Sequence, residues 1–277
     1  MARGMSLHIA VNEPDPGYYG PNLKPLKACH NDASEMAELA RQAGIKDLRT
    51  LLDADATIGN VLQSLEKYAH DANPGDLVFV TYSGHGSQIP VADTGSTDED
   101  DGLDETWCLY DTQLIDTELY QSLGKFKKDV RVIVLLDCCH SGTAIHEWIH
   151  ESWHFIEQYL ADRDHRFRHV PENLRGDMYK KHRDEYLARQ EKVSLGMPSV
   201  IEASVLMISA CQDNQRAIED LFNGRFTSAL LYETGNHHTY QSIHKHMHKH
   251  LHAFQSPNLY TLGAKTGELL KQPFLSI

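Results

Sequence analysis

Two apolar runs that end in chemically reactive side chains constrain the fold of this chain more than any other feature. Residues 76–82 read DLVFVTY and lead into SGHGS, while residues 130–137 read VRVIVLLD and lead into CCHSG. Unbroken aliphatic and β-branched runs are typical of strands buried on both faces of a parallel sheet. Because neighbouring parallel strands end at the same edge of a sheet, we expect the two reactive segments to meet there.

Alternating strand and helix patterns fill much of the remaining chain. Strands are predicted over residues 7–11, 48–52 and 204–210. This alternation predicts an α/β fold with a mainly parallel central sheet flanked by helices. One helix is predicted to start after the capping residue Thr57 and to end at the Asn-Pro-Gly turn at 73–75. The other helices are predicted over residues 31–43, 116–123, 148–160, 179–193 and 224–233.

Composition restricts the class of protein. A chain of 277 residues, 41% hydrophobic and 23% charged, is expected to be globular. The net charge of -13 argues against non-specific nucleic-acid binding. No apolar run is long enough to span a membrane, and residues 7–11 are too short for a signal peptide. Five irregularly spaced cysteines do not suggest a disulfide framework, so we expect a cytoplasmic location with a working thiol.

The reactive segments also carry a family resemblance. YSGHGSQ at 82–88 and DCCHSG at 137–142, with ACHND at 28–32, DEDDGLDE at 98–105 and residues 206–220, resemble the metacaspases, the caspase-like cysteine peptidases of plants, fungi, protists and bacteria. The interval of 54 positions from His85 to Cys139 is close to the separation of about 50 known for caspases. The resemblance implies a caspase-like three-layer fold in one domain over 1–277, with a large catalytic portion at 1–145, a charged helical insertion or linker at 146–198 and a small portion at 199–277.

The resemblance implies a mechanism that uses a Cys-His dyad. Cys139 is the expected nucleophile. His85 is expected to accept the thiol proton and to protonate the leaving amine, and the backbone N–H groups of Gly86 and Cys139 form the oxyanion hole. Cys138 is the alternative nucleophile. The metacaspase motif D-x-C-H-S-G favours Cys139, and strand alternation points adjacent side chains to opposite faces.

An acidic pocket is expected for the residue before the scissile bond. By resemblance, its positions are Cys29, Asp32, Ser83 and Asp137, and the substrates are proteins or peptides with Arg, or less favourably Lys, before the cut. A guanidinium offers paired donors that two carboxylates accept. The structural alternative is that Asp32 caps a helix and Asp137 accepts backbone donors. Self-cleavage, if it occurs, is expected after Arg or Lys within 163–192, and a regulatory protein partner cannot be named.

No cofactor is expected to be required. The acidic loop at 95–105 fails the EF-hand pattern, because aligning Gly102 on its glycine places Thr97, Glu99 and Cys108 at positions that need acids or Asn. Calcium-activated metacaspases carry an acid seven residues after the catalytic Cys, where this chain has His146. Both observations argue against calcium activation, which is kept as the alternative to a solvated acidic loop.

Histidine motifs suggest two further interpretations. Two overlapping H-E-x-x-H matches at 146–150 and 150–154 would suit a zinc metallopeptidase, although no third ligand is identifiable. A catalytically inactive caspase-like scaffold is the third alternative. Alternate histidines from His244 to His252 coincide with apolar residues at helical spacing, so we expect a solvated helix face and no metal site. The apolar residues are Ile243, Met247, Leu251 and Phe254.

Overall fold

The computed structural model describes residues 2–91, 102–138, 166–211, 217–236, 238–251 and 255–277. Within them the centre is a six-stranded sheet in the order β11-β9-β7-β3-β1-β2. Its strands run parallel except β11, which is antiparallel to β9. The strands of this sheet are β1 (Gly4–Ala10), β2 (Asp47–Leu52), β3 (Leu77–Ser83), β7 (Arg131–Asp137), β9 (Ser204–Ser209) and β11 (Asn258–Gly263).

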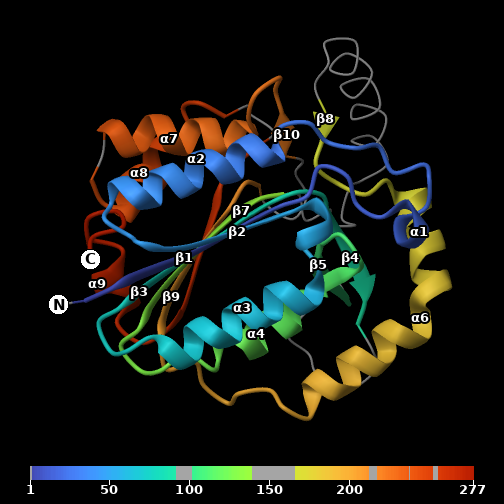
Figure 1. Ribbon diagram of the computed structural model, residues 1–277, viewed down its shortest axis with the longest axis horizontal. Coiled ribbons are helices and arrows are strands. Elements are labelled where there is room, and N and C mark those ends of the chain that lie inside the picture. Colours follow the sequence, from blue (N-terminus) through green and yellow to red (C-terminus); the bar gives the residue numbers. More distant parts are fainter. Residues whose placement is uncertain (1, 92–101, 139–165, 212–216, 237, 252–254) are drawn as a thin grey trace.

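Helices cover both faces of this sheet (Figure 1). One face packs on α2, α7 and α8, and the opposite face packs on α3 and α4, with a separate apolar core on each side. The expected three-layer α/β fold is confirmed. The helical segments are α1 (Pro16–Tyr19), α2 (Cys29–Gln42), η1 (Asp53–Asp55), α3 (Ile58–Asp71), α4 (Asp116–Leu123), α6 (Glu172–Ser194), α7 (Arg225–Asn236), α8 (Tyr240–Met247) and α9 (Thr266–Leu269).

Two small sheets lie beside the main one. β4 pairs with β5, which pairs with β6, all antiparallel, and β8 pairs antiparallel with β10. The α6 helix runs past the three-stranded sheet at the edge of the molecule (Figure 1). The strands are β4 (Gly86–Pro90), β5 (Leu103–Cys108), β6 (Gln113–Ile115), β8 (Arg166–Phe167) and β10 (Ile218–Glu219).

Local sequence explains the main elements. Every residue of β3 is buried, as is β7 after its first residue, which matches their unbroken apolar runs. The Thr57 side chain accepts a hydrogen bond from the Asn60 N–H and caps α3 as predicted. The helix predicted over 116–123 is confirmed as α4, whereas the one predicted over 148–160 lies outside the described residues.

The register of the central strands brings three carboxyl ends together. Ala10 at the end of β1 pairs with Ser83 at the end of β3, and Ser83 pairs with Asp137 at the end of β7. The turn that carries His85 therefore starts beside the end of the strand that leads into Cys139. This parallel alignment is the feature of the fold that positions the candidate site.

The α6 helix of the 146–198 segment is anchored to the body. Its Arg189 guanidinium forms an ion pair with Glu118 of α4 at 2.6 Å, and the Gln190 amide donates to the Pro90 carbonyl at 3.1 Å. The helix is longer than the predicted 179–193. It begins at Glu172, directly after Pro171, and ends at Ser194.

The histidine-rich helix is less solvated than expected. Ile243 and Met247 are buried as predicted, but the His244 ring bonds the Pro257 carbonyl at 3.0 Å and His250 bonds Glu233 at 2.6 Å. The two rings thus have different partners, because His244 lies on α8 whereas His250 lies beyond its end at Met247. No group of three or more potential metal ligands occurs within the described ranges.

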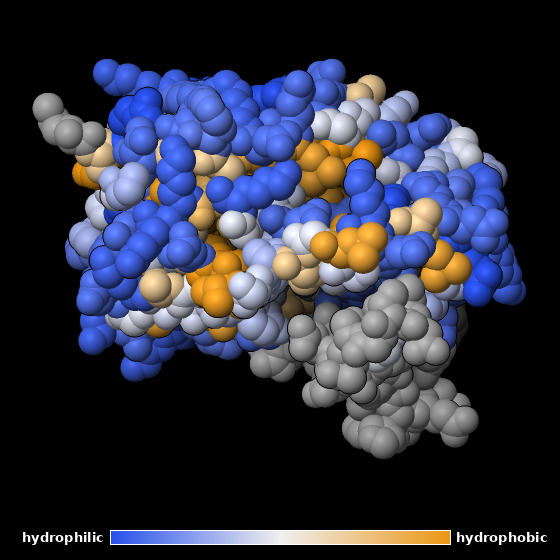
Figure 2. Space-filling model, turned by 90° about the horizontal axis from the view of Figure 1, so that it is seen from below, coloured by the Kyte–Doolittle hydropathy of each residue, from blue (hydrophilic) through white to orange (hydrophobic). Residues whose placement is uncertain are grey.

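The surface is largely hydrophilic on the face seen in Figure 2, where hydrophobic residues form separate patches. No helix in the described part of the chain has the length and apolar character that membrane crossing requires.

Candidate active site

His85 lies in a tight turn between β3 and β4. The Tyr82 hydroxyl folds back across this turn and donates to the carbonyls of His85 at 2.7 Å and Cys108 at 2.9 Å. A Cβ on Gly84 would collide with the Tyr82 ring and hydroxyl, so the turn requires glycine there. Tyr82 and Gly84 together fix the backbone from which the His85 ring extends.

The His85 ring has a defined orientation. Its Nε2 lies 2.9 Å from the Lys24 carbonyl oxygen, which can only accept, so Nε2 carries the proton. Burial lowers the pKa of His85 to about 4 and keeps the imidazole neutral at physiological pH. Its Nδ1 lone pair is therefore the one that can accept a proton from a nucleophile.

The candidate nucleophile Cys139 lies outside the described residues, but its neighbour does not. Cys138 is fully buried and its side chain belongs to the apolar core on the α3 and α4 face of the sheet. The Cys211 thiol donates to the Cys138 carbonyl at 3.7 Å, so this strand end is also tied to the segment after β9. A thiol packed in this core is poorly placed to attack a substrate.

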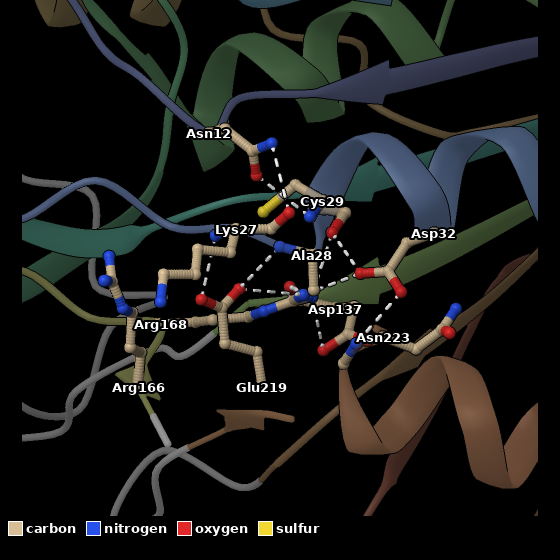
Figure 3. Close-up of polar contacts among 12 residues, drawn as sticks. Asn12, Lys27, Ala28, Cys29, Asp32, Asp137, Arg166, Arg168, Glu219 and Asn223 are labelled. Carbon is tan, nitrogen blue, oxygen red and sulfur yellow. Dashed lines mark hydrogen bonds and ion pairs between the residues drawn. The ribbon is translucent and has the colours of Figure 1, made fainter. Parts of the chain in front are cut away.

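Two predicted pocket carboxylates meet at the start of α7 (Figure 3). Asp32 accepts the Gly224 N–H at 2.9 Å and the Ser83 hydroxyl at 2.7 Å. Asp137 accepts both the N–H and the hydroxyl of Thr227, at 3.0 and 2.7 Å. The positive end of the helix dipole thus faces two buried anions. Asp32 does not act as the cap of its own helix, because the N-cap position of α2 is Ala28.

A third carboxylate, Glu219 of β10, completes this acid cluster. Its Oε1 accepts the Lys27 N–H at 2.9 Å and its Oε2 accepts the Ala28 N–H at 3.2 Å. Glu219 therefore fixes the loop that enters α2 (Figure 3). We define the acid pocket as Asp32, Asp137 and Glu219 with Ser83, and all four side chains are buried.

The acid pocket holds the side chain of Arg168, which is completely buried. Its Nη2 lies 2.6 Å from Asp32 and 3.5 Å from Glu219. Its Nη1 forms an ion pair with Asp137 at 3.0 Å and also donates to the Ser83 hydroxyl at 2.9 Å. Burial raises the pKa of Asp137 to about 6, although the guanidinium acts in the opposite direction. One cation thus faces three carboxylates.

Cys29 lines this region without contributing a reactive group. It is buried with Ala10, Leu26 and Ala33, and burial raises the pKa of its thiol. Its backbone N–H donates to the Asn12 side chain at 3.0 Å, which holds the start of α2 against the end of β1. The described structure therefore brings Cys29, Asp32, Ser83 and Asp137 together.

Sequence reasoning missed four residues of this site. Glu219 is the third acid, Thr227 donates twice to Asp137, and Arg168 occupies the pocket. A Cβ on Gly224 would collide with the Asp137 carboxylate and the Arg168 guanidinium, so Gly224 makes room for the ion pair. The one signal in the sequence was the abundance of Arg and Lys in the 146–198 segment.

Comparison with known proteins places this architecture in a family. The family model described as Caspase domain matches residues 7–266, nearly the whole chain. The chain belongs to the caspase-domain family. It thus carries a cysteine-peptidase domain, and the recognised metacaspase resemblance is confirmed by its relatives.

The chain is similar to several curated metacaspases. It is 34% identical to Metacaspase III c of Phaeodactylum tricornutum over 50% of this chain and 43% of that protein, and 35% identical to Metacaspase-6 of Arabidopsis thaliana over 51% and 39%. A longer match, at 29% identity, covers 81% of this chain and 52% of Metacaspase-1 of Coccidioides immitis. The chain spans about half the length of these relatives or less.

Solved structures agree on the fold. Protein GSU0716 from Geobacter sulfurreducens is 36% identical, with a TM-score of 0.83 over 98% of this chain and 97% of that one. Caspase-1 from Spodoptera frugiperda is 12% identical, with a TM-score of 0.53 over 95% of this chain and 88% of that one. The second likeness supports the caspase-like fold alone.

Proposed function

We propose that this protein is a cysteine endopeptidase that hydrolyses peptide bonds after Arg, and less efficiently after Lys. The observation that carries the proposal is the buried acid pocket with a guanidinium inside it. Three carboxylates facing one cation leave the pocket with excess negative charge, which disfavours an acidic side chain before the cut.

The acid pocket can exchange one guanidinium for another. Each of its carboxylates has its own donors from the backbone or a hydroxyl, as described for Asp32, Asp137 and Glu219. These donors stabilise the anions without the Arg168 cation. A substrate guanidinium can therefore replace the internal one with little rearrangement. Lys would make fewer of these contacts, because its ammonium is a point charge without the planar pair of nitrogens.

The proposed chemistry uses Cys139 and His85. The neutral His85 ring accepts the thiol proton on Nδ1 while the Lys24 carbonyl holds Nε2. The thiolate of Cys139 then adds to the scissile carbonyl, and the Gly86 N–H, next to His85 in the chain, stabilises the developing oxyanion together with the Cys139 N–H. His85 returns the proton to the departing amine, and water hydrolyses the thioester. The burial of Cys138 supports Cys139 as the nucleophile.

A reducing compartment suits this chemistry. The described cysteines, Cys29, Cys108, Cys138 and Cys211, are all free thiols. This supports the cytoplasmic location that we propose. The zinc-peptidase alternative depends on residues 146–154, outside the described part, and no observation favours it.

Fluorogenic peptides test the proposal. Four peptides that differ only in the residue before the bond (Arg, Lys, Asp or Leu) are incubated with wild type, Cys139→Ala, Cys138→Ala and His85→Ala. We expect Arg to exceed Lys, with Asp and Leu near background, and we expect activity to survive only in wild type and Cys138→Ala. A preference for Asp or Leu would overturn the pocket assignment, and activity in Cys139→Ala would overturn the nucleophile.

A further inference from the structure

Two histidines of α8 lie close together on the same side of the helix. His244 and His248 are four positions apart, and their ring centroids are separated by 5.4 Å, with an angle of 75° between the ring planes. His248 is the C-cap residue and keeps helical backbone angles, so the i,i+4 geometry extends to it. Histidines at this spacing on a helix are the paired ligands of H-E-x-x-H zinc sites.

The His244 ring is oriented as the ring of a metal ligand would be. Its Nε2 lies 3.0 Å from the Pro257 carbonyl oxygen, which can only accept, so Nε2 carries the proton and Nδ1 has the lone pair. Metal-binding histidines almost always donate their other N–H to a carbonyl, a carboxylate or water, which fixes the tautomer and the ring. Pro257 gives His244 this support.

The distance between the rings favours one coordination geometry. With a metal about 2.0–2.1 Å from one nitrogen of each ring, tetrahedral coordination places the ring centroids roughly 5.2 Å apart. A square-planar ion such as Cu²⁺ would place them about 4.5 Å apart. The observed 5.4 Å therefore fits the tetrahedral geometry of Zn²⁺. Because His248 is exposed, its ring can turn a nitrogen toward the ion at little cost.

The position of the pair on the helix also favours a cation. His244 and His248 lie in and directly after the last turn of α8, where the carbonyl end of the helix dipole carries partial negative charge. Lys245, one position after His244, projects about 100° away around the helix, so its charge does not face the pair.

We propose that His244 and His248 bind one Zn²⁺ ion, through Nδ1 of His244 and one ring nitrogen of His248. No third His, Cys, Asp or Glu joins them within the described residues, so water fills the remaining positions. The alternating histidine run as a whole predicted no metal site, and the proposal concerns this one pair.

The expected role of the ion is structural. It would close the last turn of α8 and, through the hydrogen bond of His244, tie that turn to Pro257 directly before β11. The α8 helix lies at one end of the molecule, whereas β8 and β10 beside the acid pocket lie toward the other (Figure 1). The inference is therefore independent of the proposed function.

Zinc titration of a matched pair of variants tests this inference. The reference chain carries Cys139→Ala, which removes the expected reactive thiol as a competing ligand, and His248→Ala and His246→Ala are made in that background. His246 lies on the same helix, but its Nδ1 bonds the Ser242 carbonyl. In calorimetric titrations with ZnCl₂, His248→Ala should lose one zinc per chain or bind it at least about tenfold more weakly, because a chelate becomes a single ligand. His246→Ala should match the reference.

Two further measurements locate the ion. Zn²⁺ should slow amide hydrogen exchange over residues 240–248 in the reference and in His246→Ala, but not in His248→Ala, because a bridge across one turn opposes its opening. Crystals soaked in ZnCl₂ should show an anomalous difference peak about 2.0–2.1 Å from a nitrogen of each ring. Equal zinc binding by all three chains, an equal loss in His246→Ala, or a peak only elsewhere would overturn the inference.

Discussion

Removal of the Arg168 guanidinium should destabilise the protein, and the loss should grow with pH. The variant Arg168→Gln is made in the Cys139→Ala background, so that self-cleavage cannot contribute. It leaves three buried carboxylates without a cation, and breaking a buried ion pair by removing one partner costs about 3–5 kcal/mol. We expect a loss of that size in the free energy of unfolding at pH 8.

The pH dependence follows from Asp137. Its pKa is already raised to about 6 with Arg168 present, and loss of the cation raises it further. The folded variant then binds more protons than the unfolded chain, whose Asp pKa is about 3.9. Below about pH 6 the carboxyl is protonated in the folded state whether or not Arg168 is present, so the destabilisation is smallest there. It increases as the pH rises above 6, because the folded variant keeps the proton that the Arg168-containing protein has lost.

Urea unfolding followed by tryptophan fluorescence at pH 5, 6.5 and 8 measures these free energies. The matched control is Arg41→Gln, which removes an exposed guanidinium 3.3 Å from Glu38 and should cost less than about 1 kcal/mol at every pH. Added arginine amide should restore part of the lost stability to Arg168→Gln and none to the control. Equal losses in the two variants, or a loss independent of pH, would refute the reasoning.

Three further predictions concern specificity, acid stability and metal dependence. Asp137→Ala should lower the specificity constant on Arg peptides at least tenfold, because removal of one partner from a buried charge pair costs about 2–5 kcal/mol; an unchanged constant would place the pocket elsewhere. The free energy of unfolding should fall as the pH drops from about 6.5 towards 3, because burial lowers the pKa of His8 to about 3 and the unfolded chain then binds more protons. His8→Gln should flatten this slope in acid titrations, and a parallel slope would contradict the assignment. Iodoacetamide should eliminate peptidase activity and a chelator should leave it largely intact; strict calcium dependence would show that carboxylates of this chain bind the ion.

The sequence alone predicted the elements and the edge at which the site lies. Strands β3 and β7 were identifiable because burial on both faces requires unbroken apolar runs, and Thr57 marked the start of α3 because a hydroxyl there accepts a helix N–H. The pocket positions Asp32, Ser83 and Asp137 were named through the family motifs. The structure brings them together, while the roles of Cys139 and His85 stay predictions.

Tertiary structure decided how the pocket is completed and what fills it. Glu219 lies on a two-residue strand with no periodic pattern, and it reaches the pocket only because β10 lies beside the loop that enters α2. The Lys24 carbonyl that orients His85 is a backbone atom, which every residue type provides. Composition showed that the 146–198 segment is rich in basic residues, but it could not show which of these residues occupies the acid pocket. Arg168 differs because the pairing of β8 with β10 fixes its register, and side-chain patterns in a two-residue strand cannot specify a register.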